Sequence, residues 1–141
     1  MTVADDAAAL RLAVGRFVRR VRQDVSTLPT SQAAALGRLD RDGPQTVADL
    51  AAAERVSHQS MARLVRALGE QGLVEPAEAP PGDRRRRPWR ATTLGRALLD
   101  EQRSRRVDWL AEAMRRELTA AERRTLVEAI ALIERLADAR R

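Results

Sequence analysis

The chain contains no cysteine and no lysine, and His58 is its single histidine. The absence of cysteine excludes disulfides, thiolate zinc sites and redox sensing by a thiol. A metal site built on His58 would need partner ligands, and the chain has no second histidine and no cysteine. We therefore expect no metal and no cofactor.

Long apolar segments are also absent. The 141 residues include no apolar run long enough to span a membrane, no signal-peptide core and no lipidation motif. We therefore expect a cytoplasmic protein with no membrane partner. The chain also lacks a glycine-rich phosphate loop and a carboxylate pair placed for catalysis, so we expect no enzyme and no catalytic residues.

Positive charge is concentrated in one part of the chain. The net charge is +6, and every basic residue is arginine. Residues 57–96 contain eight basic and four acidic side chains, so this segment holds +4 of the total. A basic module of this kind is typical of nucleic-acid binding, with a solvated basic face as the alternative.

The first two expected helices lie before residue 42. Apolar residues at spacings of three and four predict a long amphipathic helix over residues 10–28 that is broken at Pro29. A second helix, capped by Thr30 or Ser31, runs to about Arg41.

Residues 46–71 have the proportions of a helix-turn-helix. Thr46 and Asp49 form a capping box that begins a short helix. A turn at residues 55–56 follows, and Ser57 caps the next helix, which Gly72 ends.

A wing is expected to follow at about residues 73–91. Residues 73–75 form a short strand, residues 80–83 (Pro-Pro-Gly-Asp) form a turn, and four arginines occupy residues 84–87. Because Pro88 cannot donate to a ladder, the return strand begins late or lies at an edge.

Two more helices are expected at the carboxyl end. The first runs from Thr92 or Thr93 to Leu118, and Thr119 with Glu122 forms a capping box for the second. The second is apolar around most of its circumference and therefore needs cover on two sides. We expect a homodimer built on the terminal helices, with a monomeric bundle as the alternative. The apolar positions of the first of these helices are Leu94, Leu98, Val107, Leu110, Met114 and Leu118.

The predicted fold class is mainly α: a winged helix-turn-helix with long N- and C-terminal dimerisation helices and a small β-wing. We expect residues 1–141 to form a single domain. Within it, residues 1–29 and 93–141 are the dimerisation helices and residues 30–92 form the DNA-binding lobe.

The helix after Ser57 has one apolar face and one polar face. In a helix-turn-helix this helix enters the major groove, where glutamine pairs with adenine, arginine pairs with guanine and an alanine methyl touches thymine. Phosphate contact is the alternative for the two arginines, and Ser57 is also a simple cap. His58 lies toward the buried side, in a structural or phosphate role. The apolar face consists of Met61, Leu64, Val65 and Leu68; the candidate DNA contacts on this helix are Ser57, Gln59, Ser60, Ala62, Arg63 and Arg66.

Taken together, these elements resemble the multiple antibiotic resistance regulator (MarR) family of bacterial transcription factors. The most specific likeness is Asp83-Arg84-Arg85 followed by residues 92–96 (Thr-Thr-Leu-Gly-Arg), which matches a wing signature Asp-x-Arg and then Leu-Thr-x-x-Gly. Ala91 departs from this pattern, which usually has leucine there. The resemblance implies an interlocked homodimer, winged helices spaced for consecutive major grooves, and a small aromatic or phenolic ligand that relieves repression.

The same resemblance singles out Arg85, at the Asp-x-Arg position. We expect Arg85 to enter the minor groove of DNA, where narrow A·T-rich stretches attract arginine. Arg84, Arg86 and Arg87 are expected to contact phosphates. Asp83, which repels an acidic partner, is expected to hold the turn or to orient a neighbouring guanidinium.

The expected function is that of a sequence-specific transcriptional regulator, a repressor that binds double-stranded DNA as a homodimer on a pseudo-palindromic operator. The alternative is a winged helix used for protein interaction or for non-specific architectural DNA binding. Arg16, Phe17 and Arg20 are candidates to line an effector pocket. Their alternative is ordinary core for Phe17 and a solvated face or dimer contacts for the arginines.

Overall fold

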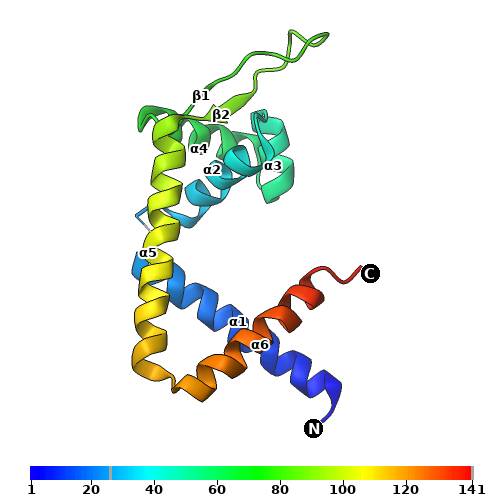
Figure 1. The fold of residues 1–141 in the computed structure, drawn as a ribbon. Helices are drawn as coiled ribbons and strands as arrows, with labels where there is room; N and C mark the ends of the chain where they lie inside the picture. Colours follow the sequence, from blue (N-terminus) through cyan, green and yellow to red (C-terminus); the bar gives the residue numbers. More distant parts are fainter. Residues whose placement is uncertain (26, 141) are drawn as a thin grey trace. The chain divides into compact units, whose positions relative to one another are not determined.

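The computed structural model describes residues 1–25 and 27–140. Within them the chain is mainly helical, with a small antiparallel wing, as the sequence predicted (Figure 1). None of the described helices is long and apolar enough to span a membrane. The elements are α1 (Val3–Val25), α2 (Thr30–Asp42), α3 (Val47–Glu54), α4 (His58–Glu70), β1 (Val74–Pro76), β2 (Trp89–Ala91), α5 (Thr93–Glu117) and α6 (Ala120–Ala137).

These elements form two compact units. One, the winged lobe, consists of residues 22–104, and the other, the terminal-helix unit, consists of residues 1–21 and 105–141. Helices α1 and α5 each contribute residues to both units.

The core of the winged lobe lies between α2, α3 and α4. Leu36, Leu50 and Leu68 are completely buried in it, and Met61 and Val65 are almost so. Burial of apolar side chains of this size is the main force that holds such a lobe together. The predicted apolar face of α4 is therefore confirmed.

Local capping signals account for several helix ends. Thr46 and Asp49 form both hydrogen bonds of the predicted capping box at 3.1 Å. Gly72, with φ +73°, follows α4, and the Leu73 N–H donates to the Leu68 carbonyl at 3.0 Å. This arrangement is a Schellman motif, in which the left-handed residue is glycine because a side chain is disfavoured there.

Two predictions at the start of the lobe are wrong. Neither Thr30 nor Ser31 caps α2: both are helical residues, and Pro29 occupies the cap position without a side-chain hydrogen bond. Leu28 does not belong to the first helix, which ends at Val25. It is buried in the core of the winged lobe, where its apolar side chain is removed from water.

The buried stripe of α5 within the winged lobe also differs from the prediction. Leu94 is 58% exposed, whereas Gly95, Leu99 and Gln102 are buried. These three positions are spaced by four and three residues, so they share one face of the helix. The amide of Gln102 donates to the Thr27 hydroxyl at 2.9 Å, which places a polar group in this stripe.

The wing is a two-stranded antiparallel sheet in which Val74 pairs with Ala91 and Pro76 with Trp89. Strand β2 starts only at Trp89, as expected for a strand that follows proline. At the far end the Asp83 N–H donates to the Pro80 carbonyl at 3.1 Å across Gly82, which has φ +88°. The predicted Pro-Pro-Gly-Asp turn is confirmed.

In the terminal-helix unit, Thr119 and Glu122 form the predicted capping box at the start of α6, with hydrogen bonds of 2.7 and 3.2 Å. No residue of α6 that the structure describes is buried. Val107, expected to be an apolar contact of α5, is 65% exposed. The described residues of this unit therefore present exposed apolar side chains.

Candidate nucleic-acid interface

Helix α4 presents a polar face opposite the core. Gln59, Ser60, Arg63 and Arg66 are exposed, and Ala62 is half-buried between the two faces. The buried face of this helix packs in the core and fixes the helix backbone, so the backbone positions of the exposed side chains are also fixed. The candidate residues of α4 thus form one continuous surface.

The amino end of α4 is closed by Ser57. Its hydroxyl accepts the Ser60 N–H at 3.0 Å and donates to the Ser60 hydroxyl at 2.9 Å. Further backbone N–H groups of this first turn lack intrahelical partners and carry the positive end of the helix dipole. His58 was expected toward the buried side of the helix, but it is exposed.

The turn between α3 and α4 rests on a strained residue. Arg55 has φ +56°, in the left-handed region that is costly for a residue with a side chain. The Val56 N–H closes the turn by donating to the Ala51 carbonyl at 3.1 Å. An ion pair between Arg38 of α2 and Glu54 at the end of α3 supports the same corner.

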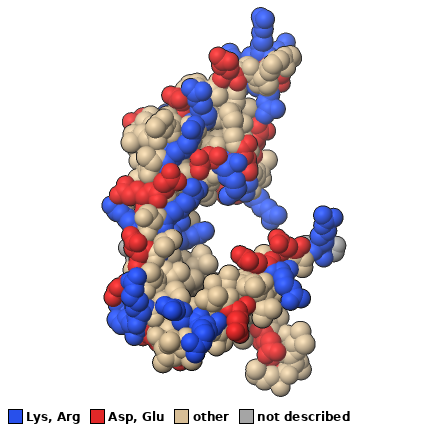
Figure 2. Space-filling view, viewed as in Figure 1, with Lys and Arg blue, Asp and Glu red and all other residues tan. Residues whose placement is uncertain are grey.

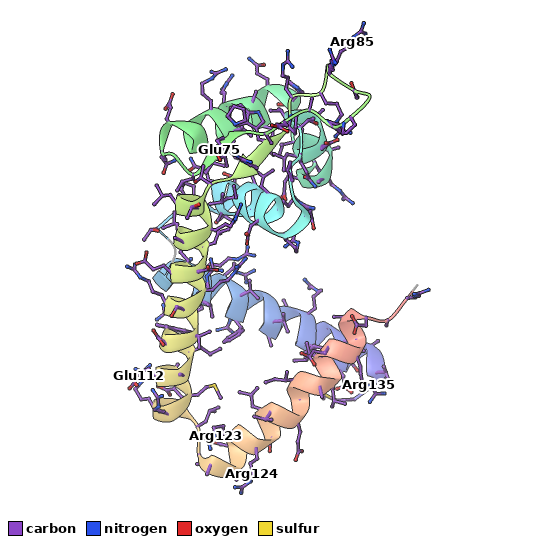
Figure 3. The ribbon with its side chains drawn as sticks, turned by 45° about the horizontal axis from the view of Figure 1, so that its top comes forward. Glu75, Arg85, Glu112, Arg123, Arg124 and Arg135 are labelled. Carbon is purple, nitrogen blue, oxygen red and sulfur yellow. The ribbon has the colours of Figure 1, made fainter. Side chains whose placement is uncertain are left out.

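The wing carries its arginines on an exposed loop. Residues 84–87 are all exposed, and Arg85 projects from the tip of the loop (Figure 3). In the space-filling view, basic side chains protrude at the wing tip with acidic groups close by (Figure 2). Asp83 accepts the Arg85 N–H at 3.3 Å, so it holds the turn as predicted.

One wing arginine makes a contact that the sequence did not reveal. The guanidinium of Arg86 lies 2.5 Å from the carboxylate of Asp49, in the first turn of α3. The pKa of Asp49 is lowered, first by the backbone hydrogen bond from Thr46 and also by Arg86. A separation of 37 residues leaves no local signal for this pair in the sequence.

The base of the wing is anchored to the segment before α3. Gln45 and Trp89 exchange two backbone hydrogen bonds of 3.0 and 2.7 Å. Pro88 is buried, and an ion pair of 2.9 Å joins Glu75 to Arg90 across the two strands. The wing therefore has a fixed base and an exposed tip.

The candidate effector residues lie on α1. Arg16, Phe17 and Arg20 are exposed, with Phe17 48% exposed rather than buried in a core. A hollow of about 350 Å³ lies at the α5–α6 corner of the same unit, and none of these three side chains is among the residues that line it. Within residues 1–25 and 27–140, no group of three or more acidic or histidine side chains could hold a metal ion.

Comparison with known proteins identifies the family. A model of the MarR family matches residues 26–86. An uncharacterized HTH-type transcriptional regulator of Mycobacterium bovis is 36% identical over 134 residues, which cover 94% of this chain and 92% of the relative.

Two solved structures are similar over nearly the whole chain. A protein from Pseudomonas aeruginosa is 35% identical, with a TM-score of 0.83 and coverage of 99% of this chain and 100% of its own. BpsR of Bordetella bronchiseptica, whose DNA binding is regulated by 6-hydroxynicotinic acid, is 25% identical, with a TM-score of 0.58 and coverage of 95% and 94%. The likeness thus extends from the matched segment to the terminal helices. The chain belongs to the MarR family of helix-turn-helix transcriptional regulators, and not to a family of enzymes.

Proposed function

We propose that the protein is a sequence-specific regulator, a repressor that binds double-stranded DNA as a homodimer on a pseudo-palindromic operator. One observation carries this proposal. Gln59, Arg63 and Arg66 lie exposed on α4, whose opposite face is core, next to a wing with four exposed arginines. A helix held in this way fits the major groove of DNA.

Base readout is assigned to α4. Gln59 can pair with adenine through two hydrogen bonds, and Arg63 or Arg66 can pair with guanine in the same way. The half-buried Ala62 can touch a thymine methyl group. The side chains of this face would therefore determine which bases are preferred.

Phosphate contacts are assigned to the amino end of α4 and to the wing. The free N–H groups of the first turn and the exposed Ser60 hydroxyl favour an anion. Ser57 is already engaged as the cap, so it acts chiefly by fixing this end of the helix.

In the wing, Arg85 extends from the tip and is assigned to the minor groove. Arg84 and Arg87 are assigned to the flanking phosphates. Arg86 differs from these arginines, because its guanidinium already holds Asp49.

A homodimer is supported by the apolar surface of the terminal-helix unit. Large apolar side chains remain exposed on both α1 and α6, which is costly for a chain that stays alone in water. A second copy would cover them and would place two winged lobes about a two-fold axis. Half-sites about 10 base pairs apart, centre to centre, fit that symmetry. The exposed side chains are Leu10, Leu12, Val14, Phe17, Val18, Leu126, Val127, Ile130, Leu132, Ile133 and Leu136.

Release from DNA by a small aromatic ligand is proposed from the similarity to BpsR, whose DNA binding responds to an aromatic acid. Arg16 and Arg20 could pair with a carboxylate, and Phe17 could stack on an aromatic ring. We also propose that residues 30–92 form the DNA-binding part and that residues 1–29 and 93–141 form the dimerisation helices. The protein would act in the cytoplasm, where bacterial DNA is accessible.

The deciding experiment is selection of bound fragments from genomic DNA with the purified protein, followed by affinity measurements on the selected site. Arg63→Ala and Gln59→Ala should weaken binding by about 1–3 kcal/mol per half-site and relax the preference at particular bases. Arg124→Ala, which removes an exposed arginine of α6, is the matched control for charge.

The alternative functions predict different results. If the protein is an architectural one, a change at Arg63 would lower its affinity equally for all DNA sequences, because phosphate contacts carry no sequence information. A protein-interaction module would enrich no DNA at all. Either result would overturn the proposed function.

A further inference from the structure

We propose that Arg86 is a positioning residue of the wing: it fixes the wing against the first turn of α3 through Asp49, and it does not bind a DNA phosphate. The inference rests on the proposed DNA-binding function for its biological consequence. The role of the ion pair in ordering the wing does not depend on DNA, because both partners belong to this chain.

The carboxylate of Asp49, which accepts from Arg86, is also held in place by the cap of its own helix. Asp49 is the third residue of α3, and its Oδ2 accepts the Thr46 N–H at 3.1 Å as part of the capping box. The same oxygen receives Nη2 of Arg86 at 2.5 Å. Exposed ion pairs are usually weak, partly because two mobile side chains must be ordered. Here one partner is already ordered by its helix.

Backbone hydrogen bonds also restrain the residues that follow Arg86. Gln45 exchanges hydrogen bonds with Trp89, and the carbonyl of the buried Pro88 accepts the Ala77 N–H at 2.9 Å. Residues 86–89 are therefore attached to residues 45–49 at two points, one through the backbone and one through the ion pair. The first attachment holds the base of the wing, and the second lies three residues closer to the arginine tip.

The charge environment separates Arg86 from its neighbours. Arg84, Arg85 and Arg87 have no carboxylate partner among the residues that the structure describes. Arg86 has one, and both members of the pair are 43% exposed. The slope of log affinity against log salt is proportional to the number of DNA phosphates that a protein neutralises. An arginine that keeps its own carboxylate partner contributes little to that count.

The first test uses the free protein. Hydrogen exchange of the Ala77, Arg85 and Trp89 amides is compared between wild type, Arg86→Ala and Asp49→Asn. We expect exchange about two- to fivefold faster in both variants, the range that an exposed ion pair supports. Arg84→Ala is the matched control and should leave these rates unchanged.

Two further variants separate the ion pair from the helix cap. Asn at position 49 keeps an oxygen that can accept the Thr46 N–H, so unchanged exchange within α3 would show that the helix is intact. Asp49→Glu restores the carboxylate at a position where a capping box favours glutamate, and slow exchange of the wing should return.

The second test measures DNA affinity against salt. Arg86→Ala and Asp49→Asn should each lower affinity, the double variant should lose no more than either single one, and the slope of log affinity against log salt should not change. Arg84→Ala should flatten that slope by about 1. The opposite pattern, a flatter slope for Arg86→Ala together with tighter binding by Asp49→Asn and unchanged exchange, would overturn the proposal. If the wild type binds no DNA, the proposed function fails, and hydrogen exchange alone still decides whether Arg86 orders the wing.

Discussion

The backbones of Gly95 and Leu73 approach each other so closely that a Cβ atom on Gly95 would lie 2.2 Å from the Leu73 carbonyl oxygen. Thr92 tightens the same junction: its hydroxyl donates to the Gly72 carbonyl at 2.6 Å and accepts the Gly95 N–H at 3.0 Å. The first turn of α5 is thereby fixed to the segment that ends α4. The Thr-x-x-Gly part of the wing signature has a physical reason in this contact.

Gly95→Ala should destabilise the chain by about 1–3 kcal/mol, because the added methyl group meets backbone rather than a movable side chain. Urea denaturation measures the change. Gly37→Ala is the matched control: Gly37 lies within α2 with no atom within 4 Å of an added Cβ, so alanine should stabilise by up to about 1 kcal/mol. Equal effects of the two substitutions would contradict the close approach at Gly95.

The turn of the helix-turn-helix contains Arg55 in a left-handed backbone conformation. Its left-handed backbone, with φ +56°, tolerates glycine better than a branched side chain. Arg55→Val should therefore be less stable than Arg55→Gly by about 1–2 kcal/mol in thermal or urea unfolding. A valine variant as stable as the glycine variant would show that this residue leaves the left-handed region in solution.

Acid should weaken the helix caps. The pKa of Glu122 is lowered by the hydrogen bonds from the Thr119 backbone and side chain, and the pKa of Asp49 is lowered chiefly by the Thr46 backbone. Since these folded-state pKa values lie below the unfolded ones, the stabilisation is complete above the unfolded pKa of about 4 and is lost as pH falls through the folded pKa.

Glu122→Gln keeps a cap acceptor without a titrating group, so its stability should depend less steeply on pH below about 5 than that of the wild type. Urea midpoints between pH 7 and pH 3 measure this dependence. Glu128→Gln, in the exposed middle of α6, is the control. A wild-type acid dependence that Glu122→Gln leaves unchanged would argue against the cap.

The proposed homodimer should give a solution mass about twice the 15.7 kDa of the chain in light scattering. Ile133→Glu places a charge on a side chain that is 42% exposed on α6, and it should shift the mass toward the monomer. Arg124→Glu, also on α6, is the control for charge alone. A monomeric wild type would remove the basis for a two-fold operator.

Substitutions of the wing arginines should differ in the DNA sites at which they lower affinity. Arg85→Ala should lose most affinity at sites with A·T-rich flanks, whereas Arg84→Ala and Arg87→Ala should weaken binding on all DNA. Asp83→Ala should resemble Arg85→Ala, because it removes the acceptor that holds the Arg85 backbone. Binding assays on sites with varied flanks test this. Tighter binding by Asp83→Ala on every sequence would mean that the wing acts only as a cloud of positive charge.

The sequence alone determined the features that depend on residues a few positions apart. The capping boxes at Thr46 and Thr119, the Ser57 cap and the stop at Gly72 are all present, because their hydrogen bonds join groups within one or two turns. The two faces of α4 follow from the helical period in the same way. The expected winged-helix architecture follows from the order of these local elements.

Packing in three dimensions selects which surfaces meet. It places Leu28 and Leu99 in the core of the lobe, and it buries Gln102 while Leu94 stays exposed. A helical period shows that a helix has an apolar face, but packing against a neighbour selects the face that is covered. The pair between Arg86 and Asp49 is of the same kind. Four consecutive arginines are chemically identical in the sequence, and only the path of the folded wing brings one of them to a carboxylate held by a helix cap.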